Sequence, residues 1–250
     1  MTMSFPAALH TEWIKIRSLR SLVGSLLAVP LAMAGLSLLI CGTLGRPVPD
    51  STDFDPVLFS YYGLSFGQLA AIVFGVIAMA GEYKNAGIRI SLAAVPNRTL
   101  FYAAKLAVVG GAVLVVGLVA SLISFLGGQA LMDRGFGIGI ADPGALRAVI
   151  GCALYLALIS LLAAGVAAVL RSVTGSLSVL VPLVLIISFV VGDVSQGGGA
   201  ADFLPDRAGQ RILLQHPSGA LGPWSGMAVL VAWTALAVGA GWWALRRRDA

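Results

Sequence analysis

The sequence predicts an all-α integral membrane protein with six transmembrane helices. Three observations lead to this prediction: the composition, the long uncharged stretches, and the uneven distribution of cations at their ends. Of 250 residues, 58% are hydrophobic and 11% are charged, whereas a soluble domain has about 25% charged residues. We therefore expect one transmembrane domain that extends over residues 1–250.

The uncharged stretches set the number of predicted spans. Six stretches contain no Asp, Glu, Lys or Arg, and each is long enough for the roughly 20 apolar residues that cross the hydrocarbon core. They cover residues 21–45, 56–81, 106–132, 148–170, 172–192 and 212–245. The last one begins with polar residues, so its span is expected to start later. The predicted spans are about 21–43, 60–81, 105–129, 147–170, 173–193 and 223–245.

The cations between these spans predict the orientation of the chain. With six spans, both termini lie on one side, and that side carries eleven of the sixteen Lys and Arg residues. Cytoplasmic segments of membrane proteins carry an excess of Lys and Arg near the span ends. We therefore expect a multi-pass protein of the cell membrane with cytoplasmic N and C termini.

Residues 4–20 are predicted to form an amphipathic helix that lies in the membrane interface and is called here the elbow helix. Its apolar residues recur at helical spacing: Phe5, Leu9, Trp13 and Ile16. Its charged residues are Glu12, Lys15, Arg17 and Arg20. A basic amphipathic helix before a span is typical of contact with membrane lipid. The alternative is an ordinary cytoplasmic tail.

The sequence argues against several functions. The net charge of +5 is explained by cations flanking the spans, so no nucleic-acid partner is expected. Cys41, Cys152, His10 and His216 are too scattered for a metal site. No Lys follows a Gly, so a Walker A phosphate cradle is absent. The predicted spans have no acid or base at their centres, which argues against an ion-coupled pump.

The most informative stretch runs from Gly81 to Lys105. It carries five charged residues between two uncharged spans, and each charge would cost at least about 2.5 kcal/mol in the hydrocarbon centre. It must therefore protrude into water. Residues from Glu82 to Leu92 are predicted to form a short helix, which Pro96 ends. This helix could dock into another protein or could simply connect two spans.

The same stretch resembles the first cytoplasmic loop of type-2 ABC exporter permeases, especially actinobacterial ones. The resemblance rests on Glu82-Tyr83-Lys84, Ile88-Arg89, Ser91-Leu92, Pro96, Arg98 and Lys105. The segment Glu12-Trp13-Ile14-Lys15-Ile16-Arg17-Ser18 is similar to the elbow helix of that family. One departure is Ala86-Gly87, where the family usually has Gly-Thr.

The resemblance implies a membrane-spanning permease subunit of an ATP-driven exporter. Its loop would be a cytoplasmic coupling helix in a cleft of a separate ABC ATPase subunit, which would hold ATP and Mg. Two permeases, as a homodimer or a pair of related chains, would act together. No catalytic, cofactor-binding or metal-binding residue is expected in this chain. The implied coupling residues are Glu82, Tyr83, Lys84, Ile88, Arg89, Leu92, Pro96 and Arg98. The implied elbow residues are Glu12, Trp13, Lys15 and Arg17.

Two questions stay open at the level of sequence. A membrane anchor or sensor subunit that recruits a cytoplasmic protein without transporting anything would have the same docking loop. The long connection between about residues 193 and 223 could be a re-entrant helix, a helix lying on the surface, or a loop. Neither the composition nor the resemblance separates these alternatives.

Overall fold

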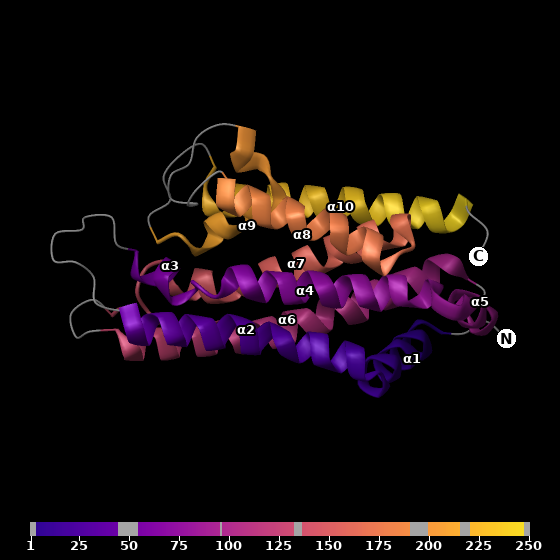
Figure 1. Ribbon diagram of the computed structural model, residues 1–250, viewed down its shortest axis with the longest axis horizontal. Coiled ribbons are helices and arrows are strands. Elements are labelled where there is room, and N and C mark those ends of the chain that lie inside the picture. Colours follow the sequence, from indigo (N-terminus) through magenta and orange to yellow (C-terminus); the bar gives the residue numbers. More distant parts are fainter. Residues whose placement is uncertain are drawn as a thin grey trace.

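The computed structural model describes residues 4–44, 55–95, 97–132, 137–190, 200–215 and 221–247, and this part of the chain is helical without strands. The helices form one elongated bundle (Figure 1). The α-helices are α1 (Phe5–Ser18), α2 (Arg20–Leu44), α3 (Pro56–Ser60), α4 (Leu64–Ala80), α5 (Gly87–Ala94), α6 (Arg98–Leu131), α7 (Ala145–Leu170), α8 (Val173–Val190), α9 (Pro205–Gln210) and α10 (Pro223–Arg247). Three 3-10 helices join them: η1 (Gly81–Ala86), η2 (Ala200–Phe203) and η3 (Arg211–Leu213).

Five of the six predicted spans are confirmed as helices long and apolar enough to cross a membrane. They are Arg20–Leu44, Leu64–Lys84, Arg98–Leu131, Ala145–Leu170 and Pro223–Arg247. The remaining prediction, 173–193, coincides with α8 (Val173–Val190), of whose side chains the structure describes Val173–Val184, a stretch shorter than a span. The count of six therefore stays a prediction.

Two span boundaries differ from the prediction because of local capping. The Asn97 side chain accepts hydrogen bonds of 3.1 Å from the backbone N–H groups of Thr99 and Leu100, so α6 begins at Arg98 instead of residue 105. Asp55 caps the short helix α3 in the same way, and a turn then delays α4 until Leu64. The first two turns of α6 therefore carry charged residues.

Helix α7 is the centre of the bundle, in contact with α4, α6 and α10, while α2 packs on α4 and α6. Small residues make close contact at these crossings. Gly63 and Gly67, a GxxxG pair at the start of α4, lie against Met33 of α2. A Cβ atom on Gly67 would be 2.7 Å from the Cβ of Met33, so only glycine permits this approach.

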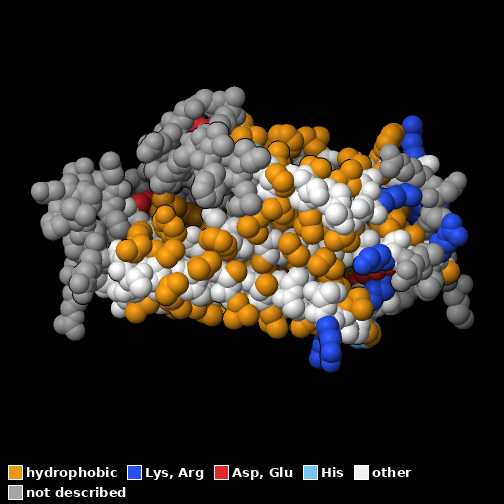
Figure 2. All heavy atoms as spheres, in the orientation of Figure 1, with side chains coloured by type: hydrophobic (Ala, Val, Ile, Leu, Met, Phe, Trp, Pro, Cys, Tyr) orange, Lys and Arg blue, Asp and Glu red, His pale blue; other side chains and the backbone are white. Residues whose placement is uncertain are grey.

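The two ends of the bundle differ. Helices α1 and α5 and the last turns of α10 lie together at one end, called here the basic end, whereas α3 and α9 lie at the other, called the far end (Figure 1). On the face in Figure 2, Lys and Arg gather at the basic end and apolar side chains cover the middle. This separation agrees with charged ends outside the hydrocarbon and an apolar belt within it.

Candidate functional site

Five side chains from four elements meet in a largely buried charge network at the basic end. The network consists of Glu12 and Lys15 of α1, Glu82 of η1, Ser91 of α5 and Lys105 of α6. The amino group of Lys105 lies 2.6 Å from Oε2 of Glu12 and 2.8 Å from Oε1 of Glu82. The amino group of Lys15 lies 2.9 Å from Oε1 of each of the same two acids. The Ser91 hydroxyl donates to Oε2 of Glu82 at 2.7 Å.

This network is electrically balanced, because two carboxylates face two ammonium groups. The side chains of Glu12 and Lys105 are only 7% and 5% exposed, and an unpaired charge at such a site would be costly. The ring of Phe101 lies below both cations, with its centroid 5.7 Å from Nζ of Lys15 and 5.4 Å from Nζ of Lys105. Each cation therefore has both ionic and aromatic partners.

The protonation of Lys15 depends on this environment. Burial lowers the pKa of Lys15, but the hydrogen bond and charge of Glu12, and then those of Glu82, outweigh burial and hold the pKa above its ordinary value of 10.5. Lys15 is therefore a cation at physiological pH, as the ion pairs require.

Helical spacing explains how the sequence builds the network. Glu12 and Lys15 are three residues apart and share one face of α1, while Phe101 and Lys105 are four apart and share one face of α6. Glu82 and Ser91 come from the two halves of the loop, and their 2.7 Å hydrogen bond closes it. The network thus joins the N-terminal helix, the loop and a membrane-spanning helix.

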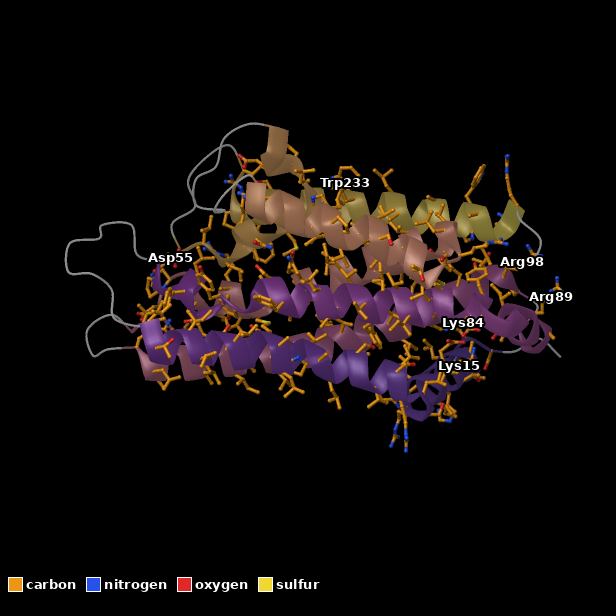
Figure 3. The ribbon with its side chains drawn as sticks, in the orientation of Figure 1. Lys15, Asp55, Lys84, Arg89, Arg98 and Trp233 are labelled. Atoms are coloured by element: carbon orange, nitrogen blue, oxygen red, sulfur yellow. The ribbon has the colours of Figure 1, made fainter. Side chains whose placement is uncertain are left out.

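The loop is a continuation of α4. Helix α4 leads without a break into η1, and α5 follows at Gly87, so the structure has two short helices where the sequence predicted one. Lys84 and Arg89 are exposed at the basic end (Figure 3), whereas Ile88 is 5% exposed and packs inside. Leu92 lies in α5, with its side chain outside the described residues, and Pro96 is also outside them.

Arg98 and Tyr83 take part in a second set of contacts, with the end of α10 and the turn after α7. The guanidinium of Arg98 donates to the carbonyl of Leu245 at 2.8 Å. This hydrogen bond satisfies one of the last carbonyl groups of α10, which have no N–H donor within the helix. Arg171 donates to the carbonyl of Ala244 at 3.4 Å, and its guanidinium lies 5.1 Å from the centroid of the Tyr83 ring. Two arginines therefore attach α10 to the loop region.

The outer face of α1 has a different character from its network face. Trp13 and Ile14 are 42% and 51% exposed, and Arg17 is exposed beside them. With His10 and Ser18 they line a shallow surface hollow. Glu12 and Ile16 are buried on the opposite face. The helix therefore has one face held by the protein and one apolar and basic face directed outward.

The sequence located most of this region but missed three of its residues. Glu82 has no other acid near it in the sequence, yet the fold brings Glu12 into contact with the same two lysines. Lys105, Ser91 and Arg171 were not among the predicted site residues. Lys105 had a usable signal, since it is a single cation at the start of a long uncharged run. Ser91 had a signal in the Ser91-Leu92 pair of the loop motif. Arg171 had none, because its partners Tyr83 and Ala244 are distant in the chain.

The chemistry of these contacts is structural. Both carboxylates of the network are neutralised by lysines, which leaves no free acid or base for proton transfer. Among the described residues, no group of three His, Cys, Asp or Glu side chains is placed to hold a metal ion. The arrangement links α1, η1, α5 and α6 to one another.

Comparison with known proteins agrees with the resemblance seen in the loop. The model of a family described as ABC-2 family transporter protein matches residues 8–192. This range includes α1 from residue 8 onward, the loop, and the helices from α2 to α8. No curated protein matches the chain. Because the matched range covers well over half of its length, the chain belongs to the ABC-2 transporter family and is a multi-pass membrane permease of an ABC transporter.

Proposed function

We propose that this permease exports its cargo by using ATP hydrolysis in a separate ABC ATPase subunit, and that η1 and α5 couple the two subunits. The observation that carries this proposal is the buried charge network. It connects Glu82 in the loop to Glu12, Lys15 and Lys105 in two other helices. A loop that merely joined two spans would not need this set of buried ionic contacts, since buried ion pairs are costly to form.

The exposed and buried residues of the loop have different roles in this proposal. Lys84 and Arg89 are exposed and are the residues available to an ATPase surface. Glu82 receives the movement and passes it to α1 and α6 through the two lysines, while the continuous helix passes it to α4. Tyr83 passes it to Arg171 and, through that residue, to α10. Ile88 holds α5 on the bundle.

The remaining features follow from the same function. Both termini and the loop would be cytoplasmic, α8 would be the sixth span, and two permeases would form the pathway between them. The chain itself would bind no cofactor, since ATP and Mg would be held by the ATPase. The outward face of α1, with Trp13 and Arg17, would rest on membrane lipid as an elbow helix.

A second function is a membrane anchor or sensor that recruits a cytoplasmic protein without moving cargo. It would use the same exposed Lys84 and Arg89. The two functions differ in one measurable property: a transported compound stimulates the ATPase only in an exporter. An assembled complex whose ATP hydrolysis responds to no compound, and which moves none across vesicles, would favour the anchor.

The test is co-purification of the chain with an ABC ATPase encoded by a neighbouring gene, followed by measurement of ATP hydrolysis in nanodiscs. Arg89→Glu should abolish assembly, because it reverses an exposed charge on the docking surface. Glu82→Gln should leave assembly intact but reduce stimulated hydrolysis, because it weakens the connection to α1 and α6. Arg247→Glu, also exposed at this end of the bundle, is the matched control and should change neither. Normal assembly and stimulation in Arg89→Glu would refute the docking role of the loop.

A further inference from the structure

An apolar groove lies between α6 and α10, with α7 as its floor. Both helices pack along α7, and residues of all three helices line the groove. Its volume is about 420 Å³, and its eleven lining residues are all Leu, Ala, Gly, Met or Val. Such a surface offers water almost no hydrogen-bond partners. The groove is therefore suited to hydrocarbon.

Two glycines of α6 shape the space in this groove. A Cβ atom on Gly110 would lie 3.1 Å from Cδ1 of Leu161 in α7, so this glycine allows the two helices to approach closely. A Cβ atom on Gly111 would have no atom within 4 Å. Gly111 therefore leaves open a space that a larger side chain would fill without displacing its neighbours.

The groove continues along one face of each helix toward the basic end. On α6 the exposed residues of this face recur every three or four positions: Thr99, Ala103, Ala107, Gly111 and Leu114. On α10 the residues at the same spacing are Met227, Val231, Ala235, Val238 and Trp242. Each face covers fifteen positions from its first to its last residue, which corresponds to about 22 Å along a helix. Half of a bilayer with its headgroups measures about 20–22 Å, so the face has the length of one phospholipid.

The two helices touch each other between the groove and the basic end. The Tyr102 hydroxyl donates to the carbonyl of Val238 at 3.1 Å, and a Cβ atom on Gly241 would lie 2.5 Å from that hydroxyl. Ala103, beside Tyr102, is exposed and has a small side chain. An acyl chain in the groove can therefore pass over this contact toward the basic end.

The end of this face carries a cation and a tryptophan at the basic end, where the last turns of α10 lie (Figure 1). The indole N–H of Trp242 donates to the hydroxyl of Thr99 at 3.3 Å. The guanidinium of Arg246, one turn later in α10, lies 4.8 Å from the centroid of the Trp242 ring and is exposed. Tryptophan is enriched at the level of lipid headgroups, and a cation there attracts an anionic headgroup.

We propose that this face binds one anionic phospholipid, with its acyl chain in the groove and its headgroup at Trp242 and Arg246. This inference goes beyond the proposed function and does not depend on an ATPase. The charge at the basic end selects this occupant over a second copy of the permease. Two copies have the same orientation in the membrane, so a second copy would bring its own cations to Arg246, whereas an anionic headgroup brings the opposite charge. The bound lipid fills the space that helix packing leaves between α6 and α10.

The headgroup contact is tested by native mass spectrometry of the purified permease alone, titrated with phosphatidylglycerol or with phosphatidylcholine of identical acyl chains. The wild type should bind phosphatidylglycerol roughly five-fold more tightly, the effect of one cation beside an anionic headgroup. Arg246→Glu should remove this preference and leave phosphatidylcholine binding unchanged. Arg247→Glu is the matched control, because Arg247 is also exposed and stacked on a tryptophan, 4.7 Å from the centroid of the Trp243 ring, but lies on a neighbouring face of α10. Equal loss of preference in the two variants, or no preference in the wild type, would overturn the headgroup contact.

The groove is tested by filling it. Gly111→Leu should weaken binding of both lipids by roughly ten-fold, because several CH₂ groups of the acyl chain would lose their place. Gly35→Leu in α2 is the matched control, because Gly35 is also an exposed glycine of a membrane-spanning helix with no atom within 4 Å of an added Cβ. Equal lipid binding in the two variants would overturn the proposal. Loss of a dimer in Gly111→Leu, with lipid binding unchanged, would overturn it in favour of a second copy as the occupant.

Photolabelling in nanodiscs tests the position of the lipid along the face. Phosphatidylglycerol with a photoreactive group at the end of its acyl chain should label α6 near Leu114 and α10 near Met227. The same lipid with the group beside its headgroup should label the peptides of Thr99 and Trp242. Excess unlabelled phosphatidylglycerol should suppress both labels more than excess phosphatidylcholine. Labelling of α2 around Leu31, which is 73% exposed, as strong as that of the groove would show that the lipid contacts the protein without selection and would overturn the site.

Discussion

Lys105 of α6 and Glu12 of α1 form a buried ion pair, with 2.6 Å between Nζ and Oε2. The same ammonium also contacts Glu82 at 2.8 Å, so a single cation holds the N-terminal helix and the loop against a membrane-spanning helix. Buried pairs of this kind are strongly destabilised when one partner is removed, because the remaining charge is left without compensation. Lys105 should therefore matter more to this region than any exposed cation.

Replacement of Lys105 by methionine tests this importance. Lys105→Met should lower the free energy of unfolding by about 3 kcal/mol, because two carboxylates would then share Lys15 alone. Thermal unfolding of the purified protein in nanodiscs would measure the effect. Lys84→Met, which removes an exposed cation from the same loop, should change stability by less than about 0.5 kcal/mol.

The double substitution Lys105→Met with Glu12→Gln separates charge from packing. Removal of one acid together with the cation restores the balance of the network, so the double variant should be more stable than Lys105→Met alone. A drop in Lys105→Met no larger than that in Lys84→Met, or no recovery in the double variant, would show that the ion pair contributes little.

Arg171 has an unfavourable backbone conformation, while its side chain contacts Tyr83 and Ala244. It ends α7 with φ of 54°, in the left-handed region, which is the only positive φ of a non-glycine residue in the described part of the chain. Arg171→Ala loses the contacts to Tyr83 and Ala244 and keeps the strained φ, whereas Arg171→Gly loses the contacts but relieves the φ. The glycine variant should therefore be more stable than the alanine variant by about 1 kcal/mol. Thermal unfolding gives the order, and the reverse order would contradict the role of φ.

The pKa of Lys15 predicts the response of the network to alkaline pH. Because the folded pKa lies above 10.5, the value in the unfolded chain, the stability that Lys15 contributes is fully present below pH 10.5. It is lost as pH rises through the higher folded pKa. Titration of Lys15 should thus cause no change in the unfolding temperature between about pH 6 and pH 9. Lys15→Arg should retain stability to higher pH than wild type, since guanidinium stays protonated. Lys84→Arg should lose stability at the same pH as wild type. A fall in stability near neutral pH that Lys15→Arg removes would contradict this assignment.

The sequence by itself determined the membrane class, five of the spans and the family. These properties depend on local composition: a run of apolar residues must cross hydrocarbon wherever it lies, and charges such as Lys84 and Arg89 must leave it. The loop motif and the elbow segment are also local patterns, and they were enough to indicate the ABC-2 family.

Only the tertiary structure decided which residues meet. Glu12, Glu82 and Lys105 are far apart in the chain. Helix packing alone places the amino group of Lys105 at 2.6 Å from the Glu12 carboxylate and 2.8 Å from the Glu82 carboxylate. The position of 200–215 also required the tertiary structure, because the sequence left open a re-entrant helix, a surface-lying helix and a loop. In the fold, Arg211 is neutralised by Asp202, and Gln210 donates hydrogen bonds to Gln68 and Tyr155 inside the bundle. Burial of a polar group depends on whether a partner is present there, and composition contains no information about that partner.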